Sequence, residues 1–435
     1  MENARRAAVT ALMKQEKDGY ANLVLNTALD GFTGAQRDRA FLAAVFYGTV
    51  ERQITLDYVL QKFLAKPIAK LDAPVRAILR SALYQAQYLD SVPASAAINE
   101  AVTLTRQMGK SSAAGMVNAV LRKAVATSLT GEAFQSEEQR LSVIYSVSPQ
   151  IVSLLRAKLP QQCEDILRAA FVQPALCVRV NPLRTSVQEI EDTFAKQGIP
   201  TRRGDVPGSL YVQYKGDITQ TKLFKRGLLH VQGESSQLAC AALCPQPGQT
   251  VLDLCAAPGG KSVTLAQWMK DKGRLVSCDA MPNRLPLIED AFARMGVTCG
   301  SVLQNDAAMY RADFAGADAV LCDVPCSGLG VLAKKPDIRG KDLAGLDALT
   351  KLQARILDTA SRYVKAGGSL VYSTCTLNPD ENERIVAQFL KEHSGFVCAP
   401  VTNVPKGAQI TDNFVTLYPF CTGTDGFFVA LLKKL

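Results

Sequence analysis

Two cysteines in the C-terminal half of the chain stand where a thiol can do chemistry. Cys326 lies in DVPCSG (323–328), directly after an apolar run that predicts a strand. Cys375 lies in YSTCT (372–376), in the same kind of position. A cysteine in a turn at the end of a strand can be exposed and reactive as its thiolate, whereas a structural cysteine is usually buried inside the strand. Asp323, three residues before Cys326, adds a carboxylate, and together these groups indicate nucleophilic catalysis.

The segment VLDLCAAPGGKSVTLAQWM (251–269) predicts a cofactor site, because it is typical of a strand, a tight turn and a helix. Gly259 and Gly260 lack a Cβ, so the backbone can approach a ligand at the start of the helix, where free N–H groups point outward. Cys255 stands where a Walker A loop would have its first glycine, and no dinucleotide fingerprint is present. A nucleoside cofactor without a phosphate chain remains, and S-adenosyl-L-methionine fits; the alternative is an ordinary strand-to-helix turn. The residues expected to line the cofactor at this turn are Cys255, Ala256, Ala257, Pro258, Gly259, Gly260 and Lys261.

Carboxylates follow the predicted strands and suit the same cofactor. Asp279 ends its strand 20 residues after Gly259, the separation at which an acid reaches the ribose hydroxyls of a bound nucleoside. Asp306 follows the next strand and could accept from the adenine amine, and Asp253 lies beside the turn. Asp323 is expected to serve both the cofactor and the chemistry. A single acid after a strand could equally be a helix cap, but acids at successive strand ends favour a binding site.

These motifs resemble those of a known family. DLCAAPGGK (253–261), DVPCSG (323–328) and STCT (373–376), followed by ENE (381–383), are similar to the set shared by RNA cytosine-5 methyltransferases of the Nop2/Sun type. The resemblance implies an S-adenosylmethionine-dependent enzyme that modifies RNA.

The beginning and the end of the chain extend this resemblance. VP (92–93), AINEAV (97–102) and VNAVLR (117–122) are similar to the RNA-binding antitermination factor NusB. With DGFFVA (425–430) near the end, nearly the whole chain resembles the bacterial 16S ribosomal RNA cytosine-5 methyltransferases of the Sun/Fmu type. The implied partner is 16S ribosomal RNA or an early small-subunit assembly intermediate.

The resemblance also implies roles for the reactive groups. Cys375 would add to C6 of a cytosine, which activates C5 for attack on the cofactor methyl group, and Asp323 would hold or protonate N3 and the exocyclic amine. Cys326 would assist release. From the residues alone the two cysteines could exchange roles, because DNA cytosine methyltransferases resemble the Pro325-Cys326 arrangement and attack with that cysteine. The target base must be unpaired or flipped to reach the thiol. The lysines that could serve the RNA backbone are Lys261, Lys334 and Lys335.

Two segments depart from the family pattern. Ser148-Pro149-Gln150 and Asp337-Ile338-Arg339-Gly340 each lack the tryptophan that usually follows. Both lie outside the cofactor turn and the thiol pair, so the departures concern RNA contacts more than chemistry.

The elements that must position these groups form an α/β pattern from residue 228 onward. Strands alternating with helices imply a parallel sheet with ligands at the carboxyl ends of its strands. We expect a Rossmann-like methyltransferase domain at 231–435, preceded by an all-α NusB-like bundle at 1–140 and a small α/β RNA-binding subdomain at 141–230. The predicted strands after the cofactor turn are 274–278, 298–303, 317–322, 369–372, 414–418 and 427–432, and the predicted helices are 283–295, 346–364 and 381–391. In the bundle, helices are predicted at 7–13, 39–50, 56–63, 75–88, 96–108 and 113–125.

The net charge of +9 arises entirely ahead of residue 231. Residues 1–230 contain 29 Lys and Arg against 20 Asp and Glu, whereas residues 231–435 contain 20 of each. The basic segment 196–226 also carries aromatic residues, which suits a nucleic-acid backbone. A solvated basic surface is the alternative.

The cysteine usage and the start of the chain bear on compartment and metals. There is no signal-type apolar core and no run of transmembrane length, so we expect a cytoplasmic protein with reduced thiols and no membrane partner. The 12 cysteines include two C-x3-C pairs, but with only two histidines and no C-x2-C pair we expect no metal.

Two other functions remain open at this level. One is a related enzyme acting on transfer RNA, against which the NusB-like start argues. The other is a ribosome-assembly or antitermination protein whose methyltransferase fold is inactive, against which the intact thiol pair argues.

Overall fold

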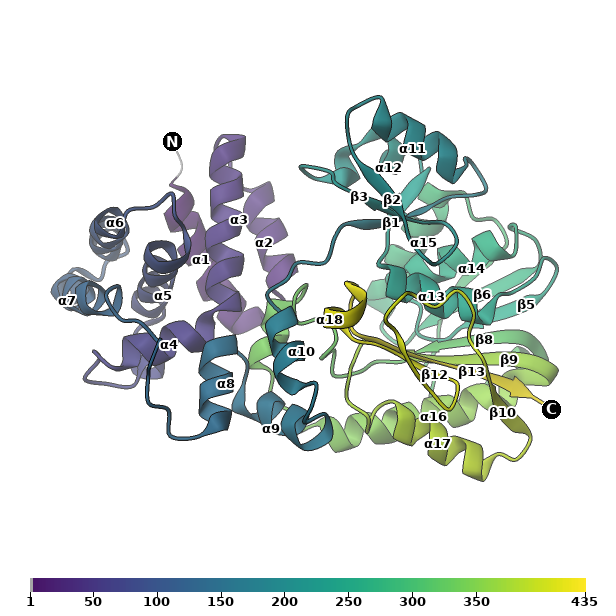
Figure 1. The fold of residues 1–435 in the computed structure, drawn as a ribbon. Coiled ribbons are helices and arrows are strands. Elements are labelled where there is room, and N and C mark those ends of the chain that lie inside the picture. The colour runs from purple at the N-terminus through teal and green to yellow at the C-terminus, as the bar shows by residue number, and fades with distance from the viewer. Residues whose placement is uncertain (1–2) are drawn as a thin grey trace. The chain divides into compact units, whose positions relative to one another are not determined.

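The computed structural model describes residues 3–435 and divides into two compact units (Figure 1). The first unit comprises Met1–Phe171 together with Leu332–Leu343, and the second comprises Val172–Val331 and Ala344–Leu435. None of the helices in residues 3–435 is long and apolar enough to span a bilayer.

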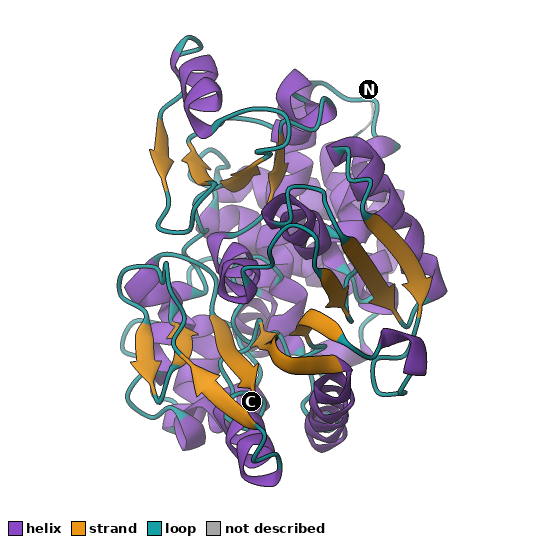
Figure 2. Ribbon diagram, turned by 90° about the vertical axis from the view of Figure 1, so that its right-hand side faces the viewer, coloured by secondary structure: helices purple, strands orange, loops and turns teal. Residues whose placement is uncertain are grey.

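Every regular element of the first unit is helical and is drawn in purple in Figure 2, in agreement with the predicted all-α start. The unit also includes residues 141–171 and 332–343, which the sequence predicts in the other two domains. Its core contains Leu42, Phe46, Leu56 and Leu83. Helix α2, which the apolar spacing did not single out, packs against α1 and α3. The helices are α1 (Ala4–Asp18), α2 (Ala21–Asp30), α3 (Gln36–Glu51), α4 (Gln53–Gln61), α5 (Ala73–Tyr88), α6 (Ala94–Gln107), α7 (Ala114–Ala124), α8 (Glu137–Tyr145), α9 (Pro149–Lys158) and α10 (Cys163–Ala169), with the short turns η1 (Ile68–Lys70), η2 (Ser111–Ala113) and η6 (Pro336–Gly340).

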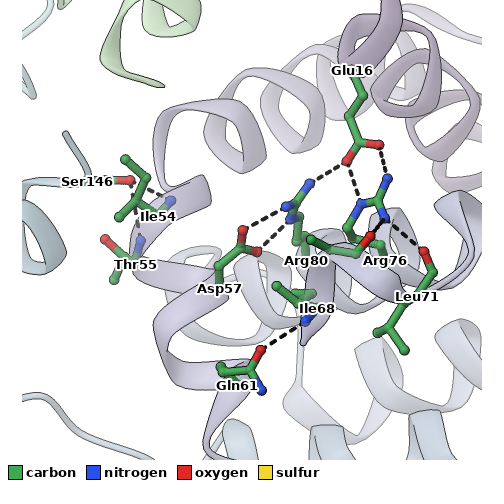
Figure 3. A network of polar contacts seen from close by, with 11 residues as sticks. Glu16, Ile54, Thr55, Asp57, Gln61, Ile68, Leu71, Arg76, Arg80 and Ser146 are labelled. Atoms are coloured by element: carbon green, nitrogen blue, oxygen red, sulfur yellow. Dashed lines mark hydrogen bonds and ion pairs between the residues drawn. The ribbon is translucent and has the colours of Figure 1, made fainter. Parts of the chain in front are cut away.

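A charged network ties α1, α4 and α5 together (Figure 3). The guanidinium of Arg80 donates to both carboxylate oxygens of Asp57, at 2.6 and 2.7 Å, and also bonds Glu16. Arg76 donates to the other oxygen of Glu16 at 2.6 Å. Burial raises the pKa of Asp57 above its ordinary value although Arg80 opposes this shift. Because removal of one partner would leave a buried charge unpaired, this network fixes the helices relative to one another.

The turn η6 is far in sequence from the rest of the helical unit but is anchored in it. Arg339 is 1% exposed, donates to Glu51 at 2.9 Å and to the carbonyl of Ala170, and lies over the ring of Phe171 at 4.2 Å. Its carbonyl accepts from the N–H of Ser148 at 2.7 Å. The two segments that depart from the family pattern therefore contact each other inside this unit.

The second unit begins with a small antiparallel sheet in the order β2-β3-β1-β4. Its core contains Val178, Ile190, Phe194 and Leu210. Helix α11 starts with a capping box in which the Ser186 hydroxyl and the Glu189 carboxylate each bond the other residue's backbone N–H. The elements are β1 (Cys177–Val180), α11 (Val187–Ala195), β2 (Thr201–Arg203), β3 (Ser209–Val212), η3 (Ile218–Gln220), α12 (Lys222–Lys225) and β4 (Leu229–Val231).

The remainder of the second unit is built on a nine-stranded sheet in the order β11-β12-β13-β9-β8-β5-β6-β7, with β10 paired to β13. Strands β5 to β9 are parallel, and β13 joins β9 antiparallel. The strand order reverses at β5, which has β6 on one side and β8 on the other, so a crevice at the carboxyl ends of β5 and β8 is the expected ligand site. The strands are β5 (Thr250–Asp253), β6 (Arg274–Asp279), β7 (Gly300–Gln304), β8 (Ala317–Asp323), β9 (Val364–Thr374), β10 (Phe396–Ala399), β11 (Gln409–Thr411), β12 (Phe414–Leu417) and β13 (Phe427–Lys434).

Helices cover both faces of this sheet. One apolar cluster joins α13, α14 and α15 to one face through Leu238, Leu265 and Ile288. A second joins α16 and α17 to the other face through Ile356 and Val386. The predicted Rossmann-like architecture behind an all-helical start and a small α/β subdomain is thereby confirmed. The helices are α13 (Glu234–Leu243), α14 (Gly260–Trp268), α15 (Leu285–Met295), α16 (Leu346–Tyr363), α17 (Glu383–Glu392) and α18 (Pro419–Thr422), with the turns η4 (Pro282–Arg284) and η5 (Ala312–Phe314).

Candidate active site

The carboxyl ends of the parallel strands carry the residues that the sequence singled out. Asp253 ends β5, Asp279 ends β6, and Asp323 ends β8. Cys375 directly follows β9, and Cys326 lies three residues beyond the end of β8. Since parallel strands align their carboxyl ends at one edge, these groups gather along that edge of the sheet.

The predicted cofactor turn joins β5 to α14. Its N–H groups are held by the sheet and by the turn itself: Ala256 donates to the carbonyl of Cys278 at 2.8 Å, and Gly259 donates to that of Ala256 at 2.7 Å. Gly259 has φ +99°, and a Cβ there would meet the Cα of Ile288 at 3.0 Å. Glycine is therefore needed both for the backbone conformation and for the close approach of α15.

Asp253 lies beneath this turn and is 0% exposed. Its Oδ2 accepts from the hydroxyl of Ser262 at 2.6 Å, while its Oδ1 has no hydrogen-bond partner among the residues that the structure describes. Burial raises the pKa of Asp253 to about 7, although the Ser262 bond opposes the shift. A buried carboxylate oxygen without a partner is a position where a ligand or its cationic group can be stabilised.

Asp279 supports the turn from the neighbouring strand and is 6% exposed. It accepts from the N–H of Met281 at 3.0 Å and from that of Ala257 at 3.3 Å. Asp306 is exposed and accepts from the N–H of Ala308 at 2.9 Å, so it orders its own loop. Three features fit a nucleoside cofactor: the glycine turn at the start of α14, the carboxylate of Asp279 on β6, and the unpartnered Oδ1 of Asp253 beneath the turn.

Lys261 links the cofactor turn to Asp323, a contact that the sequence analysis missed. Its ammonium lies 2.6 Å from Oδ2 of Asp323, whose Oδ1 accepts from the hydroxyl of Ser373 at 2.8 Å. Burial disfavours the charged form of Lys261, but Asp323 outweighs burial and raises the pKa of this lysine above its ordinary value. No local pattern could reveal the pair, because Lys261 and Asp323 lie on different strand-to-helix connections.

The two candidate thiols are in contact. The Sγ atoms of Cys326 and Cys375 lie 3.3 Å apart, and both side chains are partly buried. The contact with Cys375, together with burial, raises the pKa of Cys326 well above its ordinary value. At neutral pH this keeps Cys326 protonated, so that it can donate to its neighbour.

A glycine pair holds the Cys375 turn against the C-terminal strands. The N–H of Gly330 donates to the carbonyl of Cys375 at 2.9 Å, and the carbonyl of Gly330 accepts from the N–H of Gly426 at 2.8 Å. A Cβ at Gly330 would meet the Gly426 carbonyl oxygen at 2.1 Å. The segment 425–428 is thus linked to the Cys375 turn through the backbone of Gly330, where a Cβ would not fit.

The small sheet contacts the cofactor helix, which the sequence did not predict. Arg179 on β1 donates to Gln267 at 2.8 Å, and Gln232 accepts from Thr264 at 2.8 Å, both on α14. Burial lowers the pKa of Arg179 to about 10 and that of His230 to about 3. His230 is therefore neutral at physiological pH, whereas Arg179 still carries its charge, and the small sheet supports α14 through these buried polar contacts.

The fold and this site define a class. A doubly wound sheet with a glycine turn after its central strand, acids on the adjoining strands and a thiol pair at the same edge is that of a methyltransferase whose cofactor is S-adenosylmethionine. Among residues 3–435, no group of three or more His, Cys, Asp or Glu residues could hold a metal ion.

Comparisons with known proteins agree with this class along the whole chain. A family model described as 16S rRNA methyltransferase RsmB/F matches residues 240–433, the NusB family matches residues 2–126, and a ferredoxin-like domain of RsmF/B-like methyltransferases matches residues 150–219. The probable ribosomal RNA small subunit methyltransferase B of Bacillus subtilis is 34% identical over 99% of both chains, and its counterpart in Synechocystis is 35% identical over 100% of both. This chain belongs to the 16S rRNA methyltransferase RsmB/F family.

Solved structures show the same architecture. The crystal structure of PH0851 matches with a TM-score of 0.86 and 27% identity, covering 99% of this chain and 98% of that one. A methyltransferase homolog from Pyrococcus horikoshii matches with a TM-score of 0.62 and 28% identity, covering 69% of this chain and 100% of that one. The implied helical start, small subdomain and methyltransferase domain are confirmed by these matches.

Proposed function

We propose that this methyltransferase transfers a methyl group to C5 of a cytosine in 16S ribosomal RNA through a covalent bond between Cys375 and C6 of the base. The observation that carries this proposal is the contact of the two thiols at 3.3 Å, beside a carboxylate that is itself held by a lysine and a serine. If one of these cysteines had only a structural role, a second thiol in contact with its sulfur would serve no purpose.

The chemistry follows from the weak nucleophilicity of C5. Addition of the Cys375 thiolate at C6 forms an S–C6 bond and moves the electrons of the C5–C6 double bond onto C5. S-adenosylmethionine, when bound, supplies the electrophilic methyl group. After transfer, a base such as solvent water takes the C5 proton, the C5–H electron pair re-forms the C5–C6 double bond, and the S–C6 bond breaks with its electrons on sulfur, which restores the Cys375 thiolate.

Asp323 and Lys261 are suited to stabilise the base during this addition. Asp323 would contact N3 and the exocyclic amine, and the fixed bonds from Lys261 and Ser373 hold its oxygens in place before the substrate arrives. Lys261 would also line the methyl-donor side through the cofactor turn, together with Cys255, Ala256, Ala257, Pro258, Gly259, Gly260, Asp279 and Asp306.

The 3.3 Å contact allows either thiol to donate to the other, so the geometry alone does not separate their roles. The family resemblance assigns Cys375 as the nucleophile, and Cys326 would assist the later breaking of the S–C6 bond.

The two thiols can be tested with one experiment. Each of Cys375→Ala and Cys326→Ala is incubated with S-adenosylmethionine and 16S ribosomal RNA and run on a denaturing gel. We expect neither product nor adduct from Cys375→Ala, and a protein–RNA adduct that survives denaturation from Cys326→Ala. Cys398→Ala, on β10 away from the thiol turns, serves as the control. A stable adduct from Cys375→Ala with none from Cys326→Ala would exchange the two roles.

We further propose that the regions ahead of residue 231 bind the RNA, because they carry the whole positive excess of the chain.

The substrate in the cytoplasm would be 16S ribosomal RNA or an early small-subunit assembly intermediate. Comparing methyl transfer to naked 16S RNA, to partially assembled particles and to transfer RNA tests this. Preferred transfer to transfer RNA would contradict the proposed substrate.

A further inference from the structure

The segment Glu381-Asn382, immediately ahead of α17, has no role in the chemistry described above. Both side chains are buried, with Glu381 0% and Asn382 1% exposed. A buried carboxylate requires strong compensation by hydrogen bonds or charges. The partners that provide this compensation show what the segment does.

Glu381 accepts hydrogen bonds from the turn that carries Cys326. The backbone N–H of Ser327 donates to its Oε1 at 2.8 Å, and the hydroxyl of Ser327 donates to its Oε2 at 2.5 Å. Asn378 and Gln353 donate to the same carboxylate at 3.1 and 3.0 Å. Glu381 therefore holds Ser327 by both of its donors.

Gln353, on α16, completes the restraint on this turn. The same amide that bonds Glu381 also donates to the carbonyl of Pro325 at 2.9 Å. The residues directly before and after Cys326 are therefore both held by a network centred on Glu381.

Asn382 restrains the other turn in the same manner. Its Oδ1 accepts from the hydroxyl of Thr374 at 2.6 Å, and its Nδ2 donates to the carbonyl of Thr376 at 3.0 Å. These are the residues directly before and after Cys375. The two restraints meet where the hydroxyls of Ser327 and Thr376 lie 2.7 Å apart.

We propose that Glu381 and Asn382 are positioning residues, one for each thiol, and that together they set the Sγ–Sγ separation in the active site. Glu381 acts mainly on the groups that flank Cys326, with one longer bond from the Thr376 hydroxyl at 3.4 Å, and Asn382 acts on the groups that flank Cys375. Because the two residues are consecutive, the two turns share one support.

The proposal makes separable predictions for isosteric changes. Glu381→Gln replaces one acceptor oxygen with an NH2 group that faces donors, so it should displace the Cys326 turn. Asn382→Asp keeps the acceptor for Thr374 but places an oxygen against the carbonyl of Thr376, so it should displace the Cys375 turn. Ser327→Ala removes one of the Glu381 bonds and should act in the direction of Glu381→Gln with a smaller effect.

The first experiment needs no RNA. The full chain and its variants are treated with iodoacetamide, and the alkylation rate of each cysteine is followed by peptide mass spectrometry. We expect a severalfold change at Cys326 in Glu381→Gln and at Cys375 in Asn382→Asp, with a smaller change at the other thiol in each case. Glu383→Gln is the matched control, since Glu383 is also largely buried but accepts from Thr416 rather than from either turn. Equal changes at both thiols in both variants, or no change in either, would overturn the proposal.

The second experiment rests on the proposed function. With RNA and cofactor, Glu381→Gln should accumulate adduct as Cys326→Ala does, and Asn382→Asp should slow adduct formation by about 10- to 100-fold, because small displacements of a nucleophile are costly. S-adenosylhomocysteine binding and the melting temperature report folding; if a glutamate variant unfolds, Ser327→Ala takes its place. If no protein forms an adduct while the alkylation changes remain thiol-specific, the covalent mechanism fails and the positioning role stands. Adduct accumulation in Asn382→Asp but not in Glu381→Gln would overturn the assignment of each residue to its thiol.

Discussion

The cofactor turn after β5 and the thiol turns after β8 and β9 hold their carboxylates in different ways. On the cofactor side, Asp253 keeps a buried oxygen without a partner among the described residues, and Asp279 is backed only by backbone N–H groups. On the thiol side, Asp323 and Glu381 are bonded by specific side chains. The cofactor side thus keeps hydrogen-bonding capacity for a ligand, whereas the thiol side uses its capacity to fix protein geometry.

The largest expected effect lies on the thiol side. Asp323→Asn should lower the rate of methyl transfer by about 10²- to 10⁴-fold, because the base loses its carboxylate partner. Binding of S-adenosylhomocysteine, measured by calorimetry, separates the contribution of Asp323 to the cofactor site from its contribution to the chemistry. Asp318→Asn is the matched control, since Asp318 lies at the opposite end of β8 and also pairs with a lysine, Lys365 on β9. Equal losses of rate in both variants would show that Asp323 has no special role.

The next effect concerns pH and the buried carboxylate beneath the cofactor turn. Burial raises the pKa of Asp253 to about 7 from 3.8, so the folded state keeps a proton that the unfolded state loses first. The stability contributed by this proton is complete below about pH 4 and is lost as the pH rises to about 7. Asp253→Asn lacks this titration, so its free energy of unfolding relative to the natural chain should rise by up to about 4 kcal/mol over that window.

Urea unfolding of the cofactor-free protein at several pH values measures this difference. Asp290→Asn, an exposed position on α15, provides the comparison. A stability difference for Asp253→Asn that is constant from pH 4 to pH 7 would mean that Asp253 is as well compensated as the carboxylates of the thiol side.

A third effect tests the ligand capacity of the cofactor side directly. Asp279→Ala should weaken S-adenosylhomocysteine binding by roughly 1.5–3 kcal/mol, because charge-assisted bonds to the ribose are lost. Calorimetry measures the dissociation constant, and Asp290→Ala, at an exposed position on α15, is the control. An unchanged constant in a folded variant would remove Asp279 from the cofactor site.

The smallest effect separates the two outer acids. Asp306 is exposed and already bonds the N–H of Ala308, so Asp306→Ala should weaken cofactor binding by only about 0.5–1.5 kcal/mol. The same calorimetric titration ranks it against Asp279→Ala. A larger loss at Asp306 would reverse the order that burial predicts.

Local patterns in the sequence determined much of this protein. The glycine turn, the acids at strand ends and the alternation of strands with helices are consequences of short-range geometry, and parallel strands bring such ends to one edge of a sheet. The helical start and the small α/β subdomain follow from the same periodicities. Strand β4 was missed because three residues are too few for a period to be recognised, and helix α2 was missed although its ten residues make it longer than the predicted α4.

The tertiary structure alone decided which of these groups touch. Cys326 and Cys375 are 49 residues apart in sequence, and Lys261 reaches Asp323 from another strand connection. Arg339 lies in the segment 332–343, which belongs to the helical unit although the chain before and after this segment belongs to the other unit. Spacing fixes which residues reach the same edge of a sheet, but the contact between two side chains depends on how distant segments pack, and that information is spread over every residue of the core.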